Sequence, residues 1–167
     1  LHSHRFVLAL RMSRPGFLII TAVGCLIGVA SAASAGAGVS GPRALATLIL
    51  ALLAHAAANM LNDHADALNG ADAANTQGLY PFTGGSRLVQ SGVVQASAMR
   101  TLAQVLLALV AVGGLWLALY SGPALVLVGL AGVLLGWAYS MPPLALMSLG
   151  LGELAVGLAW GLVVLGA

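Results

Sequence analysis

Long apolar runs, separated by shorter polar breaks, follow one another along the whole chain. About 20 consecutive apolar residues suffice to cross the hydrocarbon core of a bilayer as a helix. The pattern predicts five such spans, at about residues 17–38, 44–61, 101–120, 124–140 and 151–167. Residues 62–100 and 141–150 are the predicted loops on the side of the N-terminus. We therefore expect an all-α integral membrane protein with about five transmembrane helices.

Prolines and glycines fall at or between the predicted span ends, as in Gly41-Pro42, Gly122-Pro123 and Met141-Pro142-Pro143. Proline has no N–H to donate inside a helix, so these positions favour turns. Within three spans, glycines recur at a spacing of four residues, which permits close helix contacts in lipid. These repeats are Gly24 and Gly28, Gly132 and Gly136, and Gly157 and Gly161.

The composition agrees with a membrane protein. The 167 residues are 60% hydrophobic and only 6% charged, and the mean hydropathy is +1.04, whereas about a quarter of the residues in a soluble domain are charged. The basic residues are all arginines and the formal net charge is +2, so the chain shows no nucleic-acid-binding surface. Most arginines flank the N-terminus and the 62–100 loop, with Arg43 alone on the other side. Both regions are therefore predicted to be cytoplasmic in a multi-pass protein of the cell membrane.

A cleaved signal peptide is the alternative interpretation of the first apolar run, because Ala33-Ser34-Ala35 resembles a processing site after a basic segment. The run continues beyond a usual signal sequence and more long runs follow it, so we expect it to be a retained span. The chain begins with Leu1 and ends at Ala167 within an apolar run. We interpret it as part of a longer protein.

One polar stretch, residues 59–72, follows directly on the second span. It contains three of the four acidic residues, and no basic residue lies between Arg43 and Arg87. If the helix continues through the stretch, four polar residues share one face at positions i, i+3, i+4 and i+7. An Asp at the centre of a membrane helix costs about 2.5–3.5 kcal/mol, so we expect the acids at the membrane surface or beside an aqueous cavity. The four residues are Asn59, Asn62, Asp63 and Asp66, and Asp72 follows them.

Carboxylate and amide oxygens without cysteine or paired histidine suit a hard cation, and Mg2+ better than Zn2+. Because Mg2+ is usually held by one or two carboxylates plus substrate phosphates, the stretch predicts a site for a metal-bound diphosphate. Composition alone leaves a solvated acidic loop as an equal alternative. Gly84-Gly85-Ser86-Arg87 adds N–H groups, a hydroxyl and a guanidinium that suit phosphate oxygens. We interpret His55 as a hydrogen-bonded helix residue and His64 as a surface residue.

Four motifs occur in order along the chain. They are Arg14-Pro15-x-Phe17-Leu18, then Asn62-Asp63-x-x-Asp66-x-x-x-Gly70-x-Asp72, then Pro81-Phe82-Thr83-Gly84-Gly85-Ser86-Arg87, and finally Tyr139-Ser140-x-Pro142-Pro143 with Gly150-Leu151-Gly152-Glu153. Together they resemble the UbiA superfamily of membrane prenyltransferases over nearly the whole chain. The spacing of the Asp-rich motif resembles the menaquinone-type branch, which prenylates 1,4-dihydroxy-2-naphthoate.

The resemblance implies a nine-helix bundle around a central cavity, of which residues 1–167 are the N-terminal part of one domain. It implies Mg2+-dependent transfer of a polyprenyl group from polyprenyl diphosphate to an aromatic acceptor within the lipid bilayer. Asn62 and Asp66, with Asp63 and Asp72, would hold Mg2+. Tyr139 would face the allylic cation or the acceptor. The other residues that it implies at the substrates are Asn59, Ser86, Arg87 and Glu153.

Two departures from the family pattern are visible. Residues 144–150 contain no basic residue, although family members usually carry one there. The second Asp-rich motif would lie beyond Ala167, so the chain alone is expected to be inactive. Alternative acceptors are 4-hydroxybenzoate, homogentisate, a chlorophyllide, a haem or a carotenoid. A transporter with a cation path is the alternative from another class, and it predicts acids near the bilayer midplane.

Overall fold

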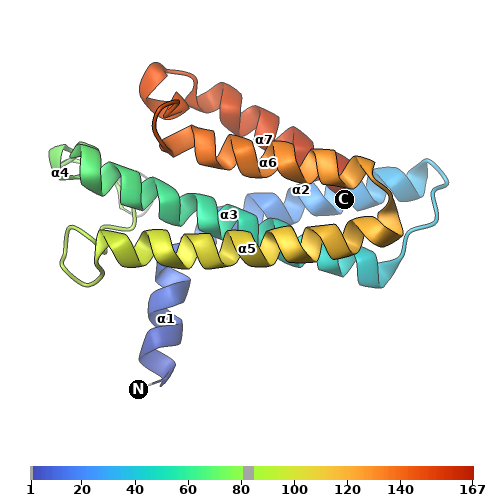
Figure 1. Ribbon diagram of the computed structural model, residues 1–167, viewed down its shortest axis with the longest axis horizontal. Coiled ribbons are helices and arrows are strands. Elements are labelled where there is room, and N and C mark those ends of the chain that lie inside the picture. The colour runs from blue at the N-terminus through green and yellow to red at the C-terminus, as the bar shows by residue number, and fades with distance from the viewer. Residues whose placement is uncertain (1, 81–84) are drawn as a thin grey trace.

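The computed structural model describes residues 2–80 and 85–167, and the side chains of residues 2–5 are not included. Within these residues the protein is all-helical, as the sequence predicts. In chain order the helices are α1 (His2–Ser13), α2 (Pro15–Ser34), α3 (Gly41–Asn69), the short α4 (Ala71–Ala74), α5 (Ala96–Ser121), α6 (Ala124–Ser140), the 3-10 helix η1 (Leu146–Leu149) and α7 (Gly152–Gly166). Figure 1 shows α2, α3, α5, α6 and α7 running along the long axis of the molecule, while α1 runs across it.

Three of the helices, α2, α3 and α5, are long and apolar enough to cross a membrane. The other two long-axis helices, α6 and α7, are apolar but have only 17 and 15 residues. The five predicted spans fall on these five helices. Several boundaries differ from the prediction. The largest difference is at α3, which continues to Asn69; α5 begins earlier, at Ala96, and α2 ends earlier, at Ser34. The polar stretch is thus helical, and α3 ends only where Gly70 adopts a left-handed conformation with φ of 82°.

Glycines allow the closest contacts between the helices. A Cβ atom on Gly28 of α2 would lie 2.4 Å from the carbonyl oxygen of Val164, in the last turn of α7, and 2.8 Å from the Cβ of Ala167, which follows α7. On Gly113 of α5 it would lie 2.6 Å from Cδ2 of Leu50 in α3. A larger residue at Gly28 would push α2 and α7 apart, whereas a larger residue at Gly113 would displace the end of the Leu50 side chain.

The three predicted glycine repeats therefore differ in the helix contacts that they make. The repeat in α2 lies against α7, since a Cβ on Gly24 would also meet Val163 at 3.2 Å. In α6, a Cβ on Gly136 would make only an ordinary contact with α3, at 3.8 Å from Ala58. The repeat in α7 has nothing within 4 Å of either Cβ position among the described residues. Its pattern does not produce a close contact in this part of the chain.

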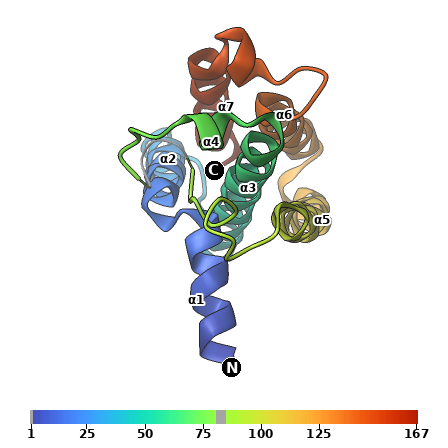
Figure 2. The ribbon, with the colours of Figure 1, turned by 90° about the vertical axis from the view of Figure 1, so that its left-hand side faces the viewer.

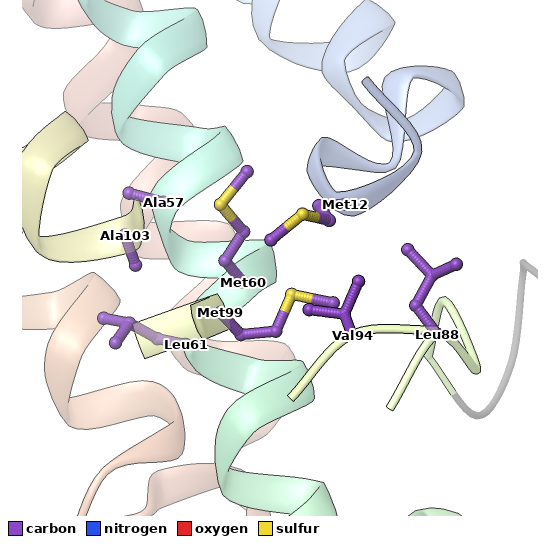
Figure 3. Close-up of a cluster of buried hydrophobic side chains, with 8 residues drawn as sticks. All are labelled: Met12, Ala57, Met60, Leu61, Leu88, Val94, Met99 and Ala103. Carbon is purple, nitrogen blue, oxygen red and sulfur yellow. The ribbon is translucent and has the colours of Figure 1, made fainter. Parts of the chain in front are cut away.

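A cluster of buried hydrophobic side chains joins α1, α3, α5 and the segment 85–95 at one end of the bundle (Figure 3). Its members are Met12, Ala57, Met60, Leu61, Leu88, Val94, Met99 and Ala103. The polar end of α3 lies beside this cluster, so packed apolar residues hold the elements that carry the acidic residues.

Candidate active site

The acidic residues of the polar stretch are buried. Asp63 and Asp66 in the last turns of α3 are 2% and 6% exposed, and Asp72 in α4 is 2% exposed. A solvated acidic loop is therefore the wrong interpretation of this stretch. Buried charges require partners, because removing an unpaired carboxylate from water is costly. The acids also lie at the end of a long helix and not at its middle, as an enzyme site predicts and a midplane ion path does not.

Arg14 supplies one partner. Its guanidinium forms an ion pair with Oδ1 of Asp63 and donates a hydrogen bond of 3.2 Å to Oδ1 of Asn62. Arg14 adopts a left-handed conformation, with φ of 52°, at the junction where α1 ends and α2 begins. Burial lowers the pKa of this guanidinium, and the negative charges of Asp72 and Asp66 oppose that effect. The junction thus places a cation inside the acidic cluster.

Gly85 lies between the two acids at the edge of the cluster. A Cβ atom on it would lie 2.9 Å from Oδ1 of Asp63, 2.9 Å from Oδ2 of Asp72 and 3.0 Å from Nη2 of Arg14. The two carboxylate oxygens are consequently no more than twice 2.9 Å apart. The N–H of Ser86 donates to Oδ2 of Asp63 at 3.2 Å. Only a residue without a side chain fits here, and its φ of +75° also favours glycine.

Asn62 connects the acidic cluster to the second loop. Its Nδ2 donates to Oδ2 of Asp66 at 2.9 Å and contacts Sδ of Met147, in η1, at 3.2 Å. The two loops that the sequence predicts on one side of the membrane therefore meet at this residue. The other oxygen of Asp66, Oδ1, is buried and has no hydrogen-bond partner among the described residues. A buried carboxylate oxygen without a partner is unusual and suits a ligand position.

Arg87 supports the outer side of the cluster. It donates to the carbonyl oxygen of Asp72 and lies over the ring of Tyr80, with its Cζ 4.9 Å from the ring centre. Nε2 of Gln90 donates to Oδ2 of Asp72 at 2.9 Å. Burial raises the pKa of the Asp72 carboxyl, while Arg14, Arg87 and this hydrogen bond act in the opposite direction. The preceding motif residues, 81–84, lie outside the described residues.

The remaining predicted site residues lie outside the group of acidic side chains and their direct partners. Asn59 donates from Nδ2 to the carbonyl oxygen of Ser13 at 2.9 Å, so its side chain holds the end of α1. Tyr139 is half-buried, and its Cε2 lies 3.6 Å from the position of a Cβ on Gly152. Glu153 is exposed in the first turn of α7 and forms no hydrogen bond or ion pair among the described residues. The structure does not bring Glu153 into the acidic cluster.

The two histidines of α3 both have partners. Nδ1 of His55 lies 2.8 Å from Oγ1 of Thr21, and its ring packs edge-on against Trp160 at 5.1 Å between centres. The prediction of a hydrogen-bonded helix histidine is confirmed. His64 is 6% exposed and its Nδ1 lies 2.9 Å from the carbonyl oxygen of Ala96. The prediction of a surface position is wrong for His64, because the start of α5 covers it.

The sequence model of the UbiA prenyltransferase family matches residues 13–167. The chain belongs to this family. Searches of curated proteins and of solved structures found no match. As a UbiA-family member, the protein is a membrane prenyltransferase, and the family uses a prenyl diphosphate and an aromatic acceptor. The match begins one residue before Arg14 and so includes the whole acidic cluster.

The donor set of this UbiA-family site suits Mg2+, although no three histidine, cysteine or acidic side chains converge as a ligand group in the described part of the chain. Mg2+ needs only one or two carboxylates when substrate phosphates complete its coordination. Asp66, with Asn62 and Asp72, offers the oxygens that would hold it, and the unpaired Oδ1 of Asp66 is the clearest candidate. Asp63 is engaged by Arg14 and by the N–H of Ser86.

Two residues of the cluster are missing from the predicted site. Arg14 appears in the sequence only as part of an entry motif, because it is 49 positions from Asp63 along the chain. Gly85 appears only as part of a flexible Gly-Gly pair. The signal for Arg14 was its place directly before Pro15, since a charged residue at the start of a membrane helix lies at the same level as the polar end of its neighbour.

Proposed function

We propose that this UbiA-family protein transfers a polyprenyl group from polyprenyl diphosphate to 1,4-dihydroxy-2-naphthoate in menaquinone biosynthesis. We place the reaction at the cytoplasmic side of the cell membrane, with Mg2+ as cofactor and residues 1–167 as the N-terminal part of the domain. The observation that carries the proposal is Asp66 near the end of the apolar helix α3. It is buried, its Oδ1 has no hydrogen-bond partner among the described residues, and the buried Asp72 lies within electrostatic reach of it. The Asp66-x5-Asp72 spacing supports naphthoate as the acceptor.

Asp66, Asn62 and Asp72 are the residues that we propose to hold the metal and, through it, the diphosphate. When bound, Mg2+ neutralises the negative charge that grows on the diphosphate as the allylic C–O bond breaks. Burial of both carboxylates strengthens their electrostatic interactions, because water is excluded from the cluster. Asp63 is the fourth proposed ligand, and it would have to exchange its bond to Arg14 for this role.

The arginines of the cluster would bind the departing diphosphate directly. Arg14 has a buried Nε without a hydrogen-bond partner among the described residues, so this N–H remains available to a phosphate oxygen. We propose that Ser86 and Arg87, on the loop that covers Asp63 and Asp72, add further donors. Asn59 acts indirectly, because its bond to Ser13 fixes the residue directly before Arg14.

Tyr139 is the aromatic residue that we propose to face the allylic carbon that reacts. It lies within electrostatic reach of Arg14 and stands at the end of α6, one residue before the buried Ser140. An aromatic face stabilises a nearby cation by about 0.5–2 kcal/mol, which suits the allylic cation that develops during transfer. We assign Glu153 no step in the transfer, because it is exposed.

A competition between acceptors tests the proposal. Membranes from cells that express the complete reading frame receive a polyprenyl diphosphate with equal amounts of 1,4-dihydroxy-2-naphthoate, 4-hydroxybenzoate and homogentisate. We expect prenylated naphthoate as the main product, and its loss when a chelator removes Mg2+. Exclusive prenylation of another aromatic would overturn the acceptor but keep the family reaction. Transfer that persists in the chelator would overturn the metal assignment.

A further inference from the structure

The first helix, α1, has a different direction from the long helices. In both ribbon views α1 extends away from the bundle, across the long axis that α2, α3 and α5 follow (Figures 1 and 2). Its end is fixed to the polar end of α3, because Asn59 donates to the carbonyl oxygen of Ser13 and the next residue, Arg14, pairs with Asp63. Since α3 and α2 span the bilayer, a helix that crosses them at their polar ends lies in the plane of the membrane surface.

One face of α1 packs on the protein. Met12 belongs to the buried cluster with Met60, Leu88 and Val94 (Figure 3). Leu8 packs against the same cluster. Residues four apart lie on the same side of a helix, so these two residues define the packed face. This face meets α3 and the segment 85–95.

The opposite face of α1 is apolar and exposed. Phe6, Val7 and Leu10 are 65%, 53% and 44% exposed. Phe6 and Leu10 are one helical turn apart. Each lies two positions from Leu8, and side chains two positions apart point to nearly opposite sides of a helix, so both point away from the packed face. Three neighbouring large apolar side chains would be unfavourable in water, but at the membrane surface they match the acyl chains below the headgroups.

The charges on α1 are all basic. Arg11 is exposed next to the apolar face, Arg5 lies on the same helix, and residues 2–13 contain no acidic residue. A helix with an apolar face and basic residues typically lies in the interface of a membrane, with the apolar face beneath the headgroups. Anionic phospholipids attract such a segment because their surface potential is negative.

We propose that α1 docks on the surface of the bilayer that the bundle spans, with Phe6, Val7 and Leu10 among the acyl chains and Arg11 at anionic phospholipid headgroups. This interaction is separate from prenyl transfer and from the metal. It fixes the end of α1 from which Arg14 enters the acidic cluster. The lipid surface, and not a second copy of the chain, is the partner because basic residues accompany the exposed face and because α2, which follows α1, also exposes large apolar side chains such as Ile19 and Ile20.

Spin labels on the complete protein in lipid vesicles test the docking. The one cysteine of the chain, Cys25, is buried in α2 and is replaced first, as Cys25→Ala. Nitroxide labels are then attached in Phe6→Cys, Val7→Cys or Leu10→Cys variants, and in a Gln77→Cys control at an exposed polar position. Collisions with oxygen, which enriches in lipid, are compared with collisions with a water-soluble nickel chelate.

We expect oxygen collisions to exceed nickel collisions for the three labels on α1, and the reverse for the control. The label at position 7 should lie deeper in vesicles of phosphatidylcholine with phosphatidylglycerol than in phosphatidylcholine alone, and Arg11→Gln should remove this difference. An unchanged depth in the two lipids would overturn the role of Arg11. Nickel collisions on α1 as frequent as at position 77 would overturn the docking.

A second copy of the chain would give a different result. Labels covered by another protomer would show dipolar broadening, and this broadening would disappear on dilution with unlabelled protein. That outcome would assign the apolar face to a dimer and overturn the lipid proposal. A Leu10→Asp variant completes the test, because it changes an exposed position and should move the label at position 7 into the aqueous phase while the protein stays folded.

Discussion

The substitution Gly85→Ala tests the arrangement of the acidic cluster most sharply. The residue has a φ of +75°, and an added Cβ would lie 2.9 Å from both Asp63 and Asp72. A left-handed conformation costs an L-residue about 1–2 kcal/mol. Overpacking adds about 1–3 kcal/mol, because Asp63 is held by Arg14 and cannot yield freely. We expect a total loss of about 2–5 kcal/mol of stability.

Gly92→Ala is the matched control, because Gly92 has a φ of +71° but no atom of the described residues within 4 Å of its Cβ position. The Gly92→Ala variant therefore has the backbone strain of about 1–2 kcal/mol without the overpacking. Thermal unfolding in detergent and prenyl transfer in membranes are measured for both variants. Gly85→Ala should melt several degrees below Gly92→Ala and lose about 10–100-fold in transfer rate. Equal melting temperatures and equal rates for the two variants would refute the packing of this loop against the carboxylates.

Three further substitutions have expected outcomes in the same melting assay. Gly28→Ala should lower stability by about 1–3 kcal/mol through overpacking, while Gly132→Ala, with an open Cβ position, should not; equal shifts would contradict the α2–α7 contact. Thr21→Val removes the hydrogen bond to His55 and should cost about 1 kcal/mol. Arg14→Met leaves a buried carboxylate unpaired and should cost about 3–5 kcal/mol, and an unchanged melting temperature would show that the ion pair contributes nothing.

The sequence predicts the helical membrane fold well, because long apolar runs and the prolines between them mark the helices directly. It also predicts the shared face of Asn62, Asp63 and Asp66, since helical spacing is a local property. The lengths of α3 and α5 were less predictable. The polar turns at their ends are stabilised by buried contacts such as His64 with the carbonyl oxygen of Ala96, which no local pattern reveals.

The partners of the acids depend on contacts that are distant in sequence. The absence of basic residues near Asp63 in the sequence pointed to a metal cation or to solvent as the partner of these charges, yet Arg14 pairs with Asp63 across 49 positions. The role of Gly85 was hidden for the same reason, since its φ and its neighbours follow from the folded loop. The burial of Asp72 likewise depends on the return of this loop and could not be predicted from α4 alone.

The most direct test of the account is the initial rate of prenyl transfer with Asp66→Asn in membranes that contain the complete protein. The matched control is Gln104→Ala, at an exposed polar position on α5. Mutation of a group that orients a metal ligand typically costs about 10–100-fold, and removal of one group that stabilises developing charge costs about 100–1,000-fold. We predict a loss within these ranges at saturating naphthoate and Mg2+, with an unchanged melting temperature and a control at the wild-type rate. Transfer by Asp66→Asn at the wild-type rate would contradict the assignment of this buried carboxylate cluster as the diphosphate site.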